Sequence, residues 1–218
     1  MRRFPATGEQ HVGTFWLLQL NSAPTSEIAP RVAATFQRAD EETIPSLAQA
    51  MGLDDTSEIQ RRFASRCRCY IALVDNILAA YGWVSFDEEE IGELHLRLHL
   101  AEGDAYIWDC ATLPAHRGLR LYPALLSYIV SELRTEGLKR IWIGADRDNL
   151  ASQSGMALVG FRPIADAVIA CVIASPRLWL RGRPGVPEHL VMDMRRMLFG
   201  ESAFAWQNAV STIKRKQG

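Results

Sequence analysis

The most informative segment of the sequence is Thr112-Leu113-Pro114-Ala115-His116-Arg117-Gly118-Leu119-Arg120-Leu121-Tyr122. Residues 105–113 form an extended run, and Pro114 and Gly118 predict a turn after it. Residues 119–135 carry apolar side chains at every fourth position and are followed by Gly137, which predicts an amphipathic helix. The segment is therefore expected to deliver a helix N-terminus beside the end of a strand.

A helix N-terminus suits an anion such as pyrophosphate, because its first backbone N–H groups lack intrahelical acceptors and the helix dipole is positive there. Arg117 and Arg120 add guanidinium groups, which can bind phosphate oxygens in pairs. Physical reasoning alone leaves two interpretations open. The segment is either a phosphate-binding turn or an ordinary strand-to-helix connection that holds a glycine and arginines without a ligand.

Further strands are predicted where apolar and polar residues alternate or where β-branched and aromatic residues are frequent. These segments are residues 12–20, 69–74, 77–86, 93–100, 140–145 and 164–173. Apolar residues at helical spacing predict further helices at residues 28–39, 43–51, 57–65 and 149–159. Asp75-Asn76 predicts a hairpin between two of the strands. From Ser175 the sequence turns basic and rich in turn residues, which predicts a connector over 175–187, followed by helices over 188–198 and 202–213.

The composition is that of an ordinary globular protein, with 218 residues, 48% hydrophobic residues, 22% charged residues and a net charge of −1. This length allows one decorated domain or two small ones. The near-neutral charge argues against a nucleic-acid partner. Polar residues 9–11 interrupt the N-terminus, so no signal peptide is expected, and the longest apolar run, 167–174, is too short to cross a membrane.

The cysteines and histidines predict no metal site. The four cysteines form no C-x-x-C pair, which fits a reducing compartment, and we expect a cytoplasmic protein. His95 and His99 would share one face of a strand but lie about 13 Å apart, too far for one metal ion. Cys67 and Cys69 have no second pair of ligands at a suitable spacing.

Several of these features together resemble the core of the GNAT superfamily of acyl-CoA-dependent N-acyltransferases. The resemblance covers Cys69 to Ile173 and is carried by residues 112–118, the helix after them, the strand at Ile141, Asn149-Leu150-Ala151-Ser152 and Gly160-Phe161. It implies an α/β (α+β) fold, in which helices flank a mixed, splayed β-sheet. The V-shaped opening of that sheet would admit the pantetheine arm of CoA.

The resemblance also implies a domain organisation and an activity. Residues 1–174 would form the acyltransferase domain. The change of composition at Ser175 separates residues 175–218 as a helical C-terminal extension, and the apolar stripe of its first helix would pack on this domain or, in a homodimer, on a partner subunit. The protein would be an N-acetyltransferase, or a transferase of another acyl group. It would use acetyl-CoA or another acyl-CoA and no metal, and the amine of a small molecule or a protein would attack directly in a ternary complex.

Three groups of residues are implied to hold CoA. The turn residues would bind the pyrophosphate through main-chain N–H groups: Arg117, Gly118, Leu119, Arg120, Leu121 and Tyr122. The strand before the turn would offer its backbone edge to the pantetheine at Ala111, Thr112 and Leu113. Asn149 and Ser152 would contact the CoA arm at the start of the next helix, although they can equally serve to cap that helix.

The sequence departs from the family pattern at three positions. The family turn has two small residues where this chain has Arg120 and Tyr122, and glycine lets a backbone approach phosphates closely. Arg120 either adds a side-chain phosphate contact or weakens the site. Many members place a tyrosine that protonates the leaving thiolate at the position of Met156, and methionine cannot donate a proton.

Asp109 and Cys110 are the candidate catalytic residues, because members of the family use this strand for general bases. Strand alternation sends them to opposite faces, so only one can reach the site. The same alternation places Cys110 with Tyr106, Trp108 and Thr112. Asp109 is either the base or a salt-bridged acid, with an ordered water chain as the alternative base.

Two other functions stay open at this point. The chain could be a non-catalytic CoA-binding or regulatory module that retains the fold, as Arg120 and Met156 suggest. It could also take its acyl group from a carrier protein or a transfer RNA. Such a donor would need an exposed basic rim, for which the candidates are Arg177, Arg181 and Arg183.

Overall fold

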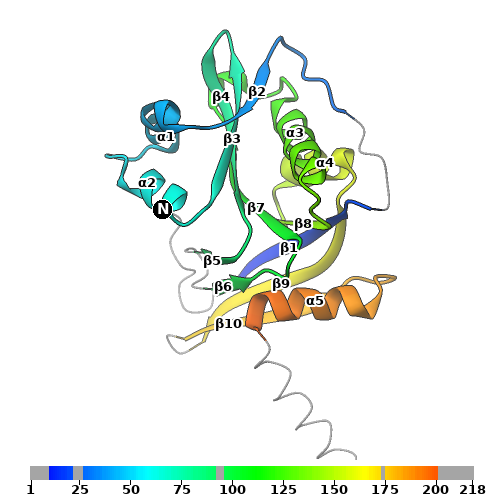
Figure 1. Ribbon diagram of the computed structural model, residues 1–218. Coiled ribbons are helices and arrows are strands. Elements are labelled where there is room, and N and C mark those ends of the chain that lie inside the picture. Colours follow the sequence, from blue (N-terminus) through cyan, green and yellow to red (C-terminus); the bar gives the residue numbers. More distant parts are fainter. Residues whose placement is uncertain (1–9, 22–26, 92–95, 173–174, 201–218) are drawn as a thin grey trace, which may run out of the picture.

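The computed structural model describes residues 10–21, 27–91, 96–172 and 175–200 and contains one large mixed sheet (Figure 1). The strand order is β10 (Ser175–Gly182), β9 (Arg162–Val172), β1 (Gln10–Gln19), β8 (Arg140–Asp146), β7 (Asp104–Thr112), β4 (Ile77–Ser85), β3 (Arg68–Val74) and β2 (Thr35–Arg38). β7 and β8 run parallel, and the other neighbouring strands described in this sheet run antiparallel. A separate pair joins β5 (Glu88–Ile91) to β6 (Leu96–His99).

Helices cover both faces of the sheet (Figure 1). Their bounds are η1 (Glu41–Thr43), α1 (Ile44–Met51), α2 (Ser57–Ala64), η2 (Pro114–His116), α3 (Leu121–Thr135), α4 (Leu150–Val159) and α5 (Glu188–Phe199). α3 and α4 lie side by side and share one apolar core with the sheet. α1 and α2 pack with β3 and β4 in a second core, and α5 packs beside β6, β9 and β10 in a third.

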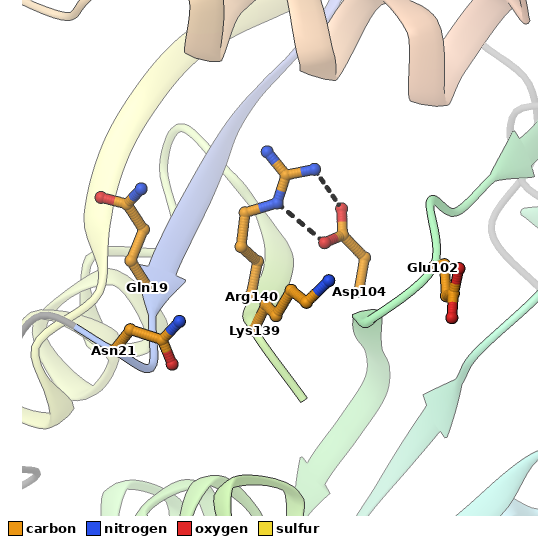
Figure 2. A pocket seen from close by; sticks show the side chains of 6 residues that line it. All are labelled: Gln19, Asn21, Glu102, Asp104, Lys139 and Arg140. Carbon is orange, nitrogen blue, oxygen red and sulfur yellow. Dashed lines mark hydrogen bonds and ion pairs between the residues drawn. The ribbon is translucent and has the colours of Figure 1, made fainter. Parts of the chain in front are cut away.

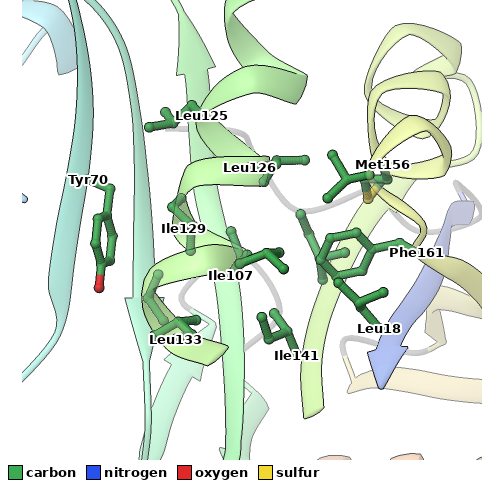
Figure 3. Packing of buried hydrophobic residues seen from close by; sticks show 14 of the residues in the cluster. Leu18, Tyr70, Ile107, Leu125, Leu126, Ile129, Leu133, Ile141, Met156 and Phe161 are labelled. Carbon is green, nitrogen blue, oxygen red and sulfur yellow. The ribbon is translucent and has the colours of Figure 1, made fainter. Parts of the chain in front are cut away.

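The predicted stripe on the 119–135 helix forms the centre of the first core. Leu125, Ile129 and Leu133 are buried along α3, and Figure 3 shows them facing the strands. Spacing by four residues places such side chains on one face of a helix. Met156 of α4 lies in the same core with Phe161.

The sheet splits into two halves between β7 and β8. Their parallel pairing covers only Asp104–Ile107 and Arg140–Ile143. Beyond this point β7 stays paired with β4 as far as Thr112, and β8 stays paired with β1 as far as Asp146. The two strands therefore part toward their carboxyl ends, and the mixed, splayed sheet predicted from the sequence is confirmed.

A bulge in β7 accounts for this parting. Tyr81 pairs with Ala111 and Trp83 with Trp108, so two residues of β7 lie opposite the single residue Gly82. A bulge of this kind bends its strand and leaves one residue out of the ladder. The two residues opposite Gly82 are Asp109 and Cys110, and Asp109 has a φ of 43°, in the left-handed region that side chains with a Cβ seldom adopt.

Two predictions of secondary structure are wrong. Residues 28–39 do not form a helix: residues 27–34 are largely irregular, and Thr35–Arg38 form β2, which pairs with β3. Pro30 cannot donate the backbone bond that a helix interior requires. Residues 175–182 are not a connector either, because they form β10, paired with β9 along its length.

The C-terminal helix α5 covers the face of the sheet opposite to α3 and α4. Its stripe of Leu190, Met194, Met197 and Leu198 is buried against residues of β1, β8 and β9. The predicted helix at 202–213 and the first residues of the predicted 93–100 strand lie outside the described residues. In the described part of the chain, none of the helices combines the length and apolar character needed to cross a bilayer.

Candidate functional site

The turn between β7 and α3 has the geometry of an anion-binding site. η2 is followed by an extended Arg117, by Gly118 with a φ of 78° and by Arg120 with a φ of 63°, and α3 then begins at Leu121. The N–H groups of Leu121 and Tyr122 belong to the first turn of α3, where no earlier helical carbonyl can accept from them. They lie at the positive end of the helix dipole, which favours an anion.

Three arginines surround this turn. Arg117 and Arg120 are exposed on it. Arg31, from the irregular segment before β2, donates its backbone N–H to the Leu119 carbonyl at 2.8 Å and its Nη1 to the Gly118 carbonyl at 3.3 Å. Sequence reasoning missed Arg31 because the helix expected at 28–39 gave no reason to place it here.

Polar atoms without partners also lie at the turn. Among the described residues, Thr112 Oγ1 and His116 Nδ1 are buried and make no hydrogen bond. A Cβ added at Gly118 would meet nothing within 4 Å, so the backbone there faces open space. Buried polar atoms normally find a partner. These observations together fit a polar ligand, such as the diphosphate of CoA, against the turn.

The strand edge before the turn divides its backbone groups between two sides. The Leu113 N–H donates to the Ala79 carbonyl at 2.9 Å, so it is directed toward β4. Because backbone groups alternate along a strand, those of Thr112 point to the other side, where β7 has parted from β8. The Thr112 carbonyl accepts a bond from Arg117 Nε at 3.3 Å. Of the three edge residues expected to meet a ligand, Thr112 therefore faces the opening.

Residues of α4 meet the turn across the opening. Asn149 caps α4, its side-chain oxygen accepting from the Ser152 N–H at 3.1 Å. The Ser152 hydroxyl lies 2.9 Å from the hydroxyl of Tyr122. A Cβ at Gly155 would come within 2.7 Å of the Tyr122 ring, so this glycine makes room for the tyrosine. The capping interpretation of Asn149 is confirmed.

Asp109 lies on the α2 side of the bulge and is held by an ion pair. Arg62 of α2 donates from Nη1 to the Asp109 carboxylate at 2.5 Å and also pairs with Glu58 at 2.9 Å. The Arg62 guanidinium carbon lies 4.4 Å from the centre of the Trp108 ring and 5.0 Å from that of Trp83. Glu58 and Arg62, four residues apart, predict only a pair within the helix. The sequence therefore gave no signal for the contact with Asp109.

Cys110 lies on the other face, toward α3, and the predicted face is wrong. It packs with the α3–α4 core, whereas Tyr106 belongs to the α5 core and Trp108 packs against the other two cores. The bulge inserts one residue and so reverses the alternation after Trp108. Burial, and then the nearby Asp109 carboxylate, raise the pKa of the Cys110 thiol. A thiol that stays protonated is a poor nucleophile.

The bulge depends on the absence of a side chain at Gly82. A Cβ there would lie 2.9 Å from Cys110 Sγ, closer than packed atoms allow. We expect Gly82→Ala to destabilise the fold by about 1–3 kcal/mol, as measured by urea unfolding. Adding Cys110→Ala removes the clashing sulfur and should recover part of this loss of stability. If the effects of the two substitutions on the free energy of unfolding were purely additive, a clash with Cys110 would not be the cause.

The opposite end of the β7–β8 pair is closed by charged side chains (Figure 2). Asp104 is buried and accepts two bonds from Arg140, each at 2.8 Å, and one from Trp142 Nε1 at 3.0 Å. Arg140 also reaches Asp193 of α5 at 2.5 Å. A hollow beside this cluster is lined by Gln19, Asn21, Glu102, Asp104, Lys139 and Arg140. It lies at the paired end of the strands, away from the turn.

The other residues considered from the sequence lie outside this site. Arg183 pairs with Asp166 at 2.8 Å, Arg181 is exposed, and the side chain of Arg177 lies outside the described part. Within the described ranges, no group of three or more histidine, cysteine, aspartate or glutamate side chains could hold a metal ion.

Comparison with known proteins bears on the whole arrangement. The sequence model described as the Acetyltransferase (GNAT) family matches residues 33–161, which is more than half of the chain. No curated protein matches the sequence.

Solved structures of low sequence identity share the fold. An acetyltransferase from the GNAT family of Colwellia psychrerythraea has a TM-score of 0.53 at 14% identity over 74% of this chain and 56% of its own. A putative GNAT acetyltransferase from Novosphingobium aromaticivorans has a TM-score of 0.54 at 14% identity over 82% and 67%. A GCN5-related N-acetyltransferase from Sphaerobacter thermophilus has a TM-score of 0.54 at 11% identity over 81% and 53%. The chain thus spans little more than half of the first of these structures.

Proposed function

The chain belongs to the acetyltransferase (GNAT) family, and we propose that it transfers an acyl group from acyl-CoA, acetyl-CoA first of all, to an amine. The observation that carries the proposal is the turn at 113–122, which presents a helix N-terminus where β7 and β8 part. An acyl-CoA would supply an activated acyl group and a thiol that leaves. Residues of this chain would bind the nucleotide, stabilise the reacting carbonyl and take the proton from the amine.

Binding of the nucleotide end would rest on the turn. The N–H groups of Leu121 and Tyr122 point along the helix axis, and Arg117, Arg120 and Arg31 supply positive charge. The edge of β7 at Thr112, with its unpartnered hydroxyl, can bind the amides of a pantetheine arm between the parted strands. Asn149 and Ser152 border the same opening from α4.

Stabilisation of the reacting carbonyl would come from the bulge. The extra residue of a bulge leaves a backbone N–H outside the strand ladder. Preorganised N–H groups of this kind stabilise the negative charge that develops on a carbonyl oxygen during acyl transfer. Asp109 and Cys110 form the bulge on the strand that borders the opening.

Asp109 is the candidate base for the attacking amine. Its carboxylate lies on the α2 face of β7, opposite the face that carries α3 and α4. The acceptor would approach from that face, past Trp108 and Arg62. The side chain of Asp109 is 33% exposed, so water can reach it and carry the proton away. The same water would serve as the base if Asp109 acts only through its ion pair.

The test of the function measures the release of CoA from acetyl-CoA in the presence of a panel of small amines and lysine peptides. The free thiol of the released CoA is titrated to follow the reaction. We expect amine-dependent release and a heavier, acylated product by mass spectrometry. Binding of CoA without release across the panel would favour the non-catalytic module instead.

The role of Asp109 has its own variant. Asp109→Asn should lower kcat about a hundredfold, the low end of what a general base contributes. Glu58→Gln is the matched control, because it removes the other partner of Arg62 and leaves β7 unchanged. An Asp109→Asn variant as active as the control would exclude Asp109 as the base.

A further inference from the structure

The irregular segment at residues 27–34 is fixed against α3. The Ile28 N–H donates to the hydroxyl of Ser127 on α3 at 3.4 Å, and apolar side chains on both sides of Arg31 pack against the α3–α4 core. Pro30 restricts the backbone directly before Arg31, because the proline ring fixes φ. Arg31 is itself exposed, and its backbone is held in place beside the turn.

Arg31 binds two successive carbonyl groups of the turn. Its backbone N–H donates to the Leu119 carbonyl at 2.8 Å, and its Nη1 donates to the Gly118 carbonyl at 3.3 Å. The C=O and N–H groups of a trans peptide unit point in opposite directions. Because both carbonyls face Arg31, the N–H groups of Leu119 and Arg120 in the same peptide units point away from it.

These two N–H groups extend the row of donors at the start of α3. Neither the Leu119 nor the Arg120 N–H makes a hydrogen bond within the part of the chain that the structure describes. They directly precede the N–H groups of Leu121 and Tyr122 in the first turn of α3. Successive backbone N–H groups of this kind bind anions. A diphosphate has oxygens on two phosphorus atoms, so it can accept hydrogen bonds from more donors than the first helical turn provides.

We propose that Arg31 is a positioning residue of the CoA site, which directs the N–H groups of Leu119 and Arg120 to the diphosphate by holding the carbonyls of the same two peptide units. This inference rests on the proposed function. The guanidinium also makes the peptide unit at Gly118 a better donor, because a carbonyl that accepts a charge-assisted bond polarises its own N–H partner. Arg31 thus acts through the turn rather than on the ligand.

The first experiment uses the unmodified full chain and follows its backbone amide signals by NMR as CoA is added. An N–H group that donates to a phosphate moves downfield, so we expect the signals of Leu119 and Arg120 to move together with those of Leu121 and Tyr122. If CoA binds and the signals of Leu119 and Arg120 stay in place, the inference is overturned and the proposed function stands. If the chain binds no CoA, both proposals fail together.

The second experiment uses Arg31→Ala, which removes the guanidinium and keeps the backbone bond to Leu119. In the variant without ligand, the Leu119 amide signal should differ from that of the unmodified protein, because its peptide unit is no longer held at the Gly118 carbonyl. CoA should bind about tenfold more weakly, which corresponds to the loss of about one hydrogen bond. The affinity for pantetheine, which lacks the diphosphate, should be unchanged.

Two further variants complete the comparison. Arg38→Ala is the matched control, because it removes the same charge from an exposed arginine of β2, where the backbone pairs with Tyr70 of β3. It should bind CoA as the unmodified protein does. Arg31→Lys keeps the charge and a donor at the end of a long side chain, so it should recover most of the affinity that Arg31→Ala loses.

The outcomes decide between positioning and direct contact. If Arg31→Ala weakens CoA binding and leaves the Leu119 amide signal of the ligand-free protein unchanged, Arg31 contacts the ligand directly and the positioning role is overturned. The role is also overturned if Arg31→Ala binds CoA as tightly as Arg38→Ala does. If Arg31→Ala does not fold, the amide titration of the unmodified chain decides the matter alone.

Discussion

Asp104→Ala is expected to lower the free energy of unfolding by about 3 kcal/mol, because it removes one partner of a buried ion pair and leaves the other without compensation. Asp104 is only 5% exposed and accepts bonds from both Arg140 and Trp142. For a chain of this size the loss corresponds to a fall in Tm of roughly 6–12 °C. Differential scanning calorimetry measures it directly.

Asp193→Ala provides the comparison for this variant. Asp193 binds the same Arg140 from α5, but its side chain is 24% exposed, and its other partner is Arg196 of the same helix. Water compensates a partly exposed partner, so we expect a loss of about 1 kcal/mol. If Asp104→Ala destabilised the protein no more than Asp193→Ala, the charged cluster would not be what holds β7 and β8 together at their closed end.

Arg120→Glu is expected to abolish the thermal stabilisation that CoA gives to the unmodified protein. At a CoA concentration about a hundredfold above Kd, that stabilisation amounts to about 2.7 kcal/mol. Arg120 is exposed on the turn at the N-terminus of α3, and a carboxylate there would repel a diphosphate. The measurement is the Tm with and without CoA.

Arg120→Gly separates charge from backbone shape at the same position. Arg120 has a φ of 63°, which costs a side chain about 1–2 kcal/mol and costs glycine almost nothing. The glycine variant should therefore be at least as stable and still respond to CoA, with a smaller response if the guanidinium binds phosphate. An unchanged Tm shift in Arg120→Glu would contradict the placement of the diphosphate.

The sequence predicted the elements whose signals are local. The hairpin at Asp75-Asn76 is confirmed, with both residues at positive φ as its turn requires. The helix after the turn shows the expected buried stripe, and Asn149 caps the next helix as its residue type indicates. In each case the information lies within a few residues of the chain.

Features that depend on long-range packing could not be predicted in this way. The bulge arises because Cys110 fills the space above Gly82 of another strand, and it reverses the faces expected from alternation. The contact of Arg62 with Asp109 joins residues that are far apart in sequence. Thr35–Arg38 form a strand because β3 offers an edge to pair with, and this overrides the apolar spacing that suggested a helix.

The strand β10 shows the same limit. Its arginines, Arg177 and Arg181, and the turn residues after them predicted a connector, since charged residues are uncommon inside a sheet. β10 lies at one edge of the sheet, where one side of its backbone pairs with none of the described strands and such residues are tolerated. Whether such a segment forms a strand depends on its position in the sheet, and the local sequence pattern does not show that position.

The claim on which the account depends is that the turn at 113–122 holds the diphosphate of CoA. A calorimetric titration of the full chain with CoA, and with pantetheine as the comparator that lacks the nucleotide and diphosphate, tests it most directly. Two charge-assisted hydrogen bonds to the diphosphate predict that CoA binds about a hundredfold more tightly than pantetheine. Equal affinities, or no binding of CoA, would contradict the account.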